Sequence, residues 1–96
     1  MNEQKIAGLI SICRKAGYLV LGGDNLKGYT HKVYLVLLDS QAGKNTKKIA
    51  TKLQVDTNAN LYELDNLASI TNISNCKLVA IKNKGLSDKI EQLLKE

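Results

Sequence analysis

The sequence predicts an α/β fold: a three-layer α-β-α sandwich around a mixed sheet of about four strands. Short apolar runs alternate with amphipathic stretches along the whole chain, without an internal repeat, a linker or a low-complexity tail. The apolar run at residues 33–38 (VYLVLL) is the strongest strand signal, and its continuity predicts a central strand covered on both faces. A chain of 96 residues supports one hydrophobic core, so residues 1–96 are expected to form one domain.

The elements before the central strand follow from periodicity and glycine. Ile6, Leu9, Ile10 and Cys13 recur at helical spacing, which predicts a helix over residues 2–16. Gly17 is a natural stop for this helix, because glycine adopts the left-handed conformation of a helix C-terminus. A short strand is expected at residues 18–21. A short helix from residue 24 to about residue 30 should follow, weakened by a glycine near its end.

The elements after the central strand continue the alternation. A polar loop at residues 41–46 should lead into a basic helix over residues 47–53, capped by Asn45 or Thr46. The remaining predicted elements, in order, are a connector at residues 54–60, a strand at 61–64, a small helix at 67–70 capped by Asp65 or Asn66, a loop at 71–75, a strand at 76–82, a turn at Lys84-Gly85 and a closing helix at 86–95.

A glycine pair, Gly22-Gly23, separates the first predicted strand from the second predicted helix. Two glycines allow a sharp turn and a close approach of the backbone to a ligand. Asp24 or Asn25 can cap the helix start, whose free N–H groups and dipole favour anions, and Lys27 adds a full positive charge one turn later. The spacing fits neither the dinucleotide fingerprint nor the P-loop. The pair is therefore either part of a phosphate or nucleic-acid site or a plain turn.

The charge balance favours a polyanionic partner. Fourteen Lys and Arg residues against nine Asp and Glu residues give a net charge of +5. In a small domain this favours RNA or DNA, although lysines also serve solubility alone. The most basic segment carries Lys44, Lys47, Lys48 and Lys52, which either form a solvated face or contact phosphates. The chain has no Trp or Phe and only four Tyr, so it lacks the base-stacking platform of common single-strand RNA modules.

The sequence contains little that suggests catalysis or metal binding. Cys13 and Cys76 form no C-x-x-C pair and fall on apolar stripes, so they are expected to be core thiols. His31 has no partner at metal-ligand spacing and is expected at the surface. Asp39, at the end of the central strand, is either a capping or turn residue or a catalytic carboxylate without an evident partner. We therefore expect no enzyme activity, cofactor or metal.

No apolar run is long enough to span a bilayer, and the first residues show no signal-peptide pattern. A cytoplasmic protein without a membrane partner is expected.

Several segments in order resemble the ribosomal protein L7Ae family, in particular its small bacterial YlxQ/YbxF-like branch. They are IAGLISICRKAG at residues 6–17, LVLG at 19–22, YLVLLD at 34–39, NTKKI at 45–49 and KLVAI at 77–81. The resemblance covers nearly the entire chain and rests on the order and spacing of these segments together. It implies a three-layer α-β-α fold and binding of kink-turn RNA, a sharply bent duplex that contains tandem G·A pairs.

The resemblance also implies where RNA would bind. In the family, a G-x-N-E-x-x-K-like segment opens the second helix and reads guanine edges, while its Lys meets phosphates. Aligned on the second glycine of the pair, Asn25 keeps the Asn and Leu26 replaces the Glu. Aligned on the first glycine, Asp24 and Asn25 replace Asn-Glu, and Gly28 stands at the Lys position.

A second family contact is a loop before the last strand, where an apolar residue packs on an extruded base. Asn72-Ile73-Ser74-Asn75 occupies this place, so Ile73 either meets a base or anchors the loop. The residues expected to bind RNA are Gly22, Gly23, Asp24, Asn25, Lys27, Lys32, Asn72, Ile73, Ser74 and Asn75.

The leading hypothesis is a non-enzymatic, monomeric RNA-binding protein that recognises structured RNA and is ribosome-associated or regulatory. Two alternatives remain open. One is a protein-interaction module that kept the fold and lost RNA binding, as the missing family Glu and the short second helix suggest. The other is an enzyme acting on a phosphorylated or nucleotide substrate, with Gly22-Gly23 cradling phosphate and Asp39 as acid or base.

Overall fold

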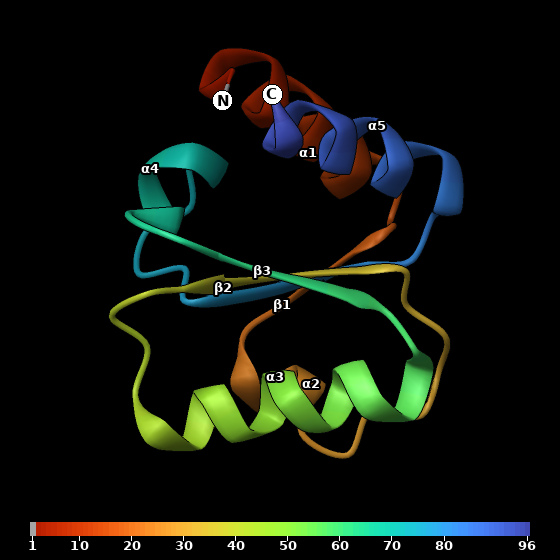
Figure 1. Ribbon diagram of the computed structural model, residues 1–96, viewed down its shortest axis with the longest axis vertical. Helices are drawn as coiled ribbons and strands as arrows, with labels where there is room; N and C mark the ends of the chain where they lie inside the picture. The colour runs from red at the N-terminus through yellow and green to blue at the C-terminus, as the bar shows by residue number, and fades with distance from the viewer. Residues whose placement is uncertain (1) are drawn as a thin grey trace.

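A computed structural model describes residues 2–96 and has the predicted three layers (Figure 1). A mixed sheet of four strands, in the order β1-β4-β2-β3, has α1, α4 and α5 on one face and α2 and α3 on the other. The elements are α1 (Glu3–Lys15), β1 (Leu19–Leu21), α2 (Gly23–Leu26), β2 (Leu35–Asp39), α3 (Lys44–Thr57), β3 (Asn60–Leu64), α4 (Leu67–Thr71), β4 (Leu78–Ile81) and α5 (Lys84–Lys95). The predicted α-β-α sandwich is confirmed.

The sheet is mixed because β4 lies between β1 and β2. It pairs antiparallel with both, whereas β2 and β3 run parallel and are connected through α3. All five residues of β2 are buried: Leu35 and Leu37 pack toward the α1, α4 and α5 layer, and Val36 and Leu38 pack toward α2 and α3. The prediction of a central strand covered on both faces is therefore confirmed, although the strand starts and ends slightly later than expected.

The helix α3 is longer than the prediction, because its buried face continues to Thr57, one turn past the expected end. Leu53 and Thr57 are buried, and the Thr57 hydroxyl donates to the Leu53 carbonyl at 2.7 Å. The helix ends only at Asn58, which has a φ of 57°. The predicted connector at residues 54–60 is wrong, and so are the predicted caps, since the helix starts after Gly43 without a side-chain cap.

The start of α5 also differs from the prediction. The side chain of Asn83 accepts a hydrogen bond from the Leu86 N–H at 2.9 Å, so the helix is capped there and begins at Lys84. The expected turn at Lys84-Gly85 is therefore the first turn of a helix. Asn83 was not predicted as a cap, because the glycine at position 85 indicated a chain reversal instead.

Asp39 is a structural carboxylate that joins three segments of the chain. It is 1% exposed, and its two oxygens accept hydrogen bonds from the Gln41 N–H at 2.7 Å and from the Leu67 N–H at 2.8 Å. The ammonium of Lys77 lies 3.7 Å away. The capping role expected for Asp39 is confirmed. Asn66 occupies the N-cap position of α4, as expected, but neither its side chain nor that of Asp65 makes the capping bond, because the Asp39 carboxylate accepts from the first N–H of α4.

The environment of Asp39 lowers the pKa of its carboxyl below the usual value of 3.8. Burial is the largest influence and by itself raises the pKa, but the hydrogen bonds from Gln41 and Leu67, together with the charge of Lys77, outweigh it. The carboxyl is therefore ionised in the folded protein at neutral pH.

The expectations for cysteine and histidine are confirmed. Cys13 and Cys76 are buried free thiols, and burial raises the pKa of both. His31 is exposed, and its ring meets that of Tyr29 edge-on at 5.4 Å.

The side chain of Ser87 is buried although its hydroxyl forms no hydrogen bond with residues 2–96. A buried unpaired hydroxyl costs about 1 kcal/mol or more, and Ala is also the better helix former. Ser87→Ala should therefore raise the free energy of unfolding, measured in urea, by about 1 kcal/mol. Ser11→Ala, at an exposed helical position, is the control and should gain only about 0.5 kcal/mol. A loss of stability in Ser87→Ala would contradict the assignment.

The longest helix of the described chain is α3. Neither it nor any other helix within residues 2–96 combines the length and apolar character needed to cross a membrane.

Candidate nucleic-acid interface

Antiparallel pairing brings two of the predicted segments to one edge of the sheet. Since β1 ends where β4 begins, residues 22–25, which we call the glycine corner, lie at the same end of the sheet as the loop before β4. The Gly22 N–H donates to the carbonyl of Leu78, the first residue of β4, at 2.9 Å. The end of β2 lies at the same edge, where the Asp39 N–H donates to the Lys77 carbonyl at 2.9 Å. In Figure 1 the loop between α4 and β4 and the start of α3 lie at the left.

The glycine corner is a tight turn followed by a single helical turn. Gly22 has a φ of 82°, a conformation that side chains disfavour. A Cβ on Gly23 would lie 3.3 Å from the Ile49 side chain, so this glycine allows α2 to approach α3. The expected caps are wrong: Gly22 precedes α2, and Asp24 and Asn25 lie inside it. With only four residues, α2 has a small dipole, so side-chain charges must supply the positive potential here.

Asn25 is held in place by the strand before it. Its side-chain Nδ2 donates to the Leu21 carbonyl at 2.8 Å. This bond spans four residues and fixes the amide at the exposed surface of the corner. The exposed carboxylate of Asp24 lies beside it in sequence, so the corner presents oxygen acceptors next to the exposed Lys27.

The start of α3 carries an unfavourable charge distribution for a helix. No acidic residue lies in its first turn and no side chain caps it, yet Lys44, Lys47 and Lys48 are all exposed there. Within residues 2–96, these three lysines form no salt bridge. Cations at the positive end of a helix destabilise it, so this positive cluster is not explained by folding.

Lys48 of the lysine cluster and the glycine corner face a common hollow of about 640 Å³. Its walls are residues 21–25 and Lys27 on one side, and Asn45, Thr46, Lys48 and Ile49 on the other. The prediction of binding residues omitted the start of α3. Its lysines were noted in the sequence, but only the packing of α2 against α3 places Lys48 beside the corner.

The loop before β4 has the exposed polar surface expected of a contact segment. Asn72 and Asn75 have φ angles of 57° and 58°, which turn the chain from α4 into β4. Asn72, Ser74 and Asn75 are exposed. Ile73 is half-buried and packs on the hydrophobic core, which supports the anchor interpretation of this residue. We call residues 22–27, 44–48 and 72–75 together the edge surface.

Lys32 lies apart from the edge surface. Its ammonium donates to the Thr57 carbonyl at the end of α3 and lies 5.3 Å from the centre of the Tyr34 ring. Both partners lie at the opposite end of the sheet, where β2 begins. The structure therefore places the other predicted binding residues at one end of the sheet and Lys32 at the opposite end.

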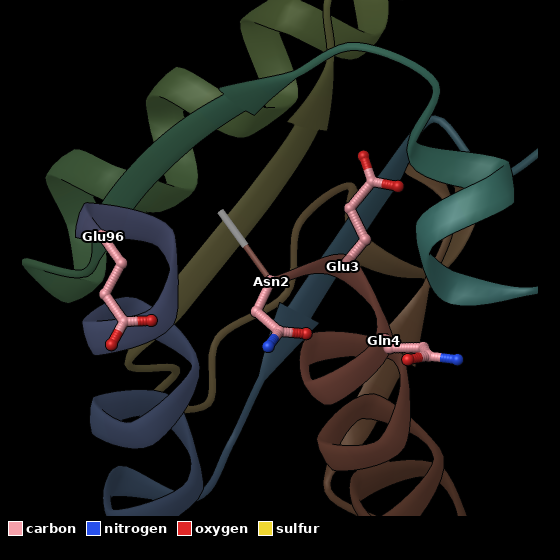
Figure 2. Close-up of a pocket in the computed structure, with 4 residues that line it drawn as sticks. All are labelled: Asn2, Glu3, Gln4 and Glu96. Carbon is pink, nitrogen blue, oxygen red and sulfur yellow. The ribbon is translucent and has the colours of Figure 1, made fainter.

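A separate hollow of about 620 Å³ lies near the two ends of the chain, lined by Asn2, Glu3, Gln4 and Glu96 (Figure 2). The side chains of Glu3 and Gln4 point away from that of Glu96 and do not converge on a common point. Across residues 2–96, no cluster of three or more His, Cys, Asp or Glu residues could hold a metal ion.

These features define the class of structure: a three-layer α-β-α sandwich with a lysine-rich edge. A solved structure described as a protein with unknown function from Bacillus halodurans is similar, with a TM-score of 0.79 and 24% identity. The similarity covers 96% of this chain and 98% of that one, and it establishes the fold. No protein-family model and no curated protein matches the chain.

Proposed function

We propose that this protein is a non-enzymatic RNA-binding protein that recognises structured, kink-turn-like RNA through the edge surface. The observation that carries the proposal is the uncapped start of α3, where Lys44, Lys47 and Lys48 have no salt-bridge partners in the described chain and Lys48 lines the same hollow as the glycine corner. The resemblance to the ribosomal protein L7Ae family supports the same conclusion. We further propose that the protein acts as a cytoplasmic monomer on a ribosomal or regulatory RNA.

The edge surface has separate groups for affinity and for specificity. Lys27 and the lysines of α3 neutralise phosphates, which supplies affinity that falls with added salt. Asp24 and Asn25 accept hydrogen bonds from base edges, which distinguishes bases. Free RNA samples bent and extended forms, and a protein that contacts both sides of a bend stabilises the bent form through its higher affinity for it.

Direct binding measurements test this proposal. The protein is titrated with a kink-turn RNA and with the same duplex in which Watson–Crick pairs replace the G·A pairs, over a range of salt concentrations. We expect the kink-turn RNA to bind at least about 100-fold more tightly than the Watson–Crick duplex at about 0.15 M salt. This ratio is a lower bound, because specific binding to nucleic acid typically exceeds non-specific binding by about 1,000-fold or more. Equal, salt-sensitive binding to both would leave only a basic surface, and no binding to either would favour the protein-interaction alternative.

A further inference from the structure

A third hollow, of about 630 Å³, lies beside the edge surface between the chain after α2 and the middle of α3. Its floor is apolar: Leu26 and Leu53 are buried, and Ile49 and Tyr29 are half-buried. The chain after α2 forms one wall of this hollow. Gly28, with a φ of 73°, turns the chain there so that Tyr29 packs against the hydrophobic core on the α3 side of the sheet. We call this hollow the Tyr29 groove.

The rim of the Tyr29 groove is positively charged. Lys27, Lys48 and Lys52 line it together with a single acidic residue, Asp56. Lys52 pairs with Asp56 at 2.6 Å, whereas Lys27 and Lys48 have no salt bridge within residues 2–96. An apolar floor below two unpaired cations complements a molecule with a flat apolar body and an anionic group. A nucleotide has this chemistry, and the volume lies within the usual range for small-ligand sites.

The Tyr29 groove continues into the edge surface. Lys27, Lys48 and Ile49 line both hollows. A phosphate held between the two lysines is therefore next to the groove and to the edge surface at once. A nucleic-acid strand on the edge surface has only to turn one unpaired nucleotide sideways for its base to reach the apolar floor.

We infer that the Tyr29 groove holds the base of one unpaired nucleotide of the bound RNA, with its phosphate between Lys27 and Lys48. This inference rests on the proposed function. The base packs on Leu26, Leu53 and the ring of Tyr29, which the His31 ring supports edge-on. Contact between a base and an aromatic or apolar surface changes affinity about tenfold or more.

The test replaces each unpaired nucleotide of the kink-turn RNA in turn with an abasic residue, which keeps the phosphate and removes the base. For one RNA of this abasic series, the wild-type protein should bind the intact RNA about tenfold more tightly than the abasic RNA. Thr30→Trp fills the groove from an exposed position on its wall and should abolish this difference while binding the abasic RNA as the wild type does. Val55→Trp, at a position 75% exposed and outside the groove, is the control and should keep the difference.

The outcomes separate this inference from the proposed function. If the wild type prefers kink-turn RNA but Thr30→Trp keeps the full difference at every position, the inference alone is overturned. If the wild type shows no preference for kink-turn RNA, the proposed function fails and the inference fails with it. If free AMP binds in the groove and Thr30→Trp leaves RNA binding unchanged, the ligand of the groove is a free nucleotide and not a nucleotide of the RNA. This result would also overturn the inference.

Discussion

Replacing Lys44, Lys47 and Lys48 together with glutamine is expected to weaken kink-turn RNA binding about 100-fold at low salt. Each of these exposed lysines lacks a salt bridge within residues 2–96, so each is available to neutralise a phosphate. Because counterion release scales with the number of phosphates contacted, the magnitude of the slope of log K against log salt should also fall by about two to three. Preference for kink-turn RNA over plain duplex should change little, since lysine–phosphate contacts position the RNA without reading bases.

The same substitutions are expected to stabilise the protein. The lysines lie at the uncapped start of α3, where the helix dipole disfavours positive charge, and they repel one another at spacings of three and four residues. Their removal should raise the free energy of unfolding by about 0.5 kcal/mol. A loss of binding together with a gain of stability indicates residues retained for a ligand, and unfolding of the variant would not produce this combination.

A charge-matched control separates a local site from the overall charge. Lys5→Gln, Lys82→Gln and Lys89→Gln change exposed lysines away from the edge surface and take the net charge from +5 to +2, as the test variant does. Fluorescence anisotropy measures RNA binding and urea denaturation measures stability for both variants. If the control weakens binding as much as the test variant, the edge surface is not the binding site.

Asp39→Asn is expected to reduce the free energy of unfolding by about 2–3 kcal/mol. The two oxygens of this buried carboxylate accept one N–H each, from Gln41 and Leu67. An asparagine has a single oxygen, so its NH₂ group must face one of these donors and leave it unpaired. The start of α4 and the turn after β2 lose their common anchor as a result. RNA binding below the unfolding transition should persist, because the carboxylate is not exposed on the edge surface.

The pH dependence of stability tests the same residue independently. The pKa of Asp39 is lower in the folded protein than the usual value of 3.8, so the unfolded chain takes up the proton first as pH falls. The ionised carboxylate therefore contributes stability above about pH 4, and this contribution is lost as pH falls through the folded pKa. The difference in stability between the wild type and Asp39→Asn should shrink over this acidic range.

The control for both measurements is Asp65→Asn. This exposed carboxylate accepts a hydrogen bond from the Ser40 hydroxyl at 2.6 Å, and the amide oxygen of asparagine can accept the same bond. We expect a change within about 0.5 kcal/mol. If Asp39→Asn is as mild as this control, the carboxylate does not anchor α4.

The sequence alone determined the fold class, because the features that encode it are local. The apolar run at residues 33–38 predicted a strand buried on both faces, and β2 is fully buried in the sheet interior. Helical spacing of apolar residues placed α1 within one residue at each end, and Gly17, with a φ of 78°, ends it as expected. Periodicity and glycine conformation depend on a few neighbouring residues, so they can be recognised without the fold.

Only the tertiary structure decided which charges share a site. Lys32 and Lys27 are close in sequence, yet Lys32 lies at the far end of the sheet, while Lys48 of α3 lines the hollow beside the glycine corner. Likewise, the cap of α4 comes from Asp39, a residue 28 positions earlier, and not from the neighbouring Asp65 or Asn66. Such pairings depend on strand order and on where the folded backbone leaves its N–H groups, and local sequence patterns do not encode distances between segments far apart in the chain.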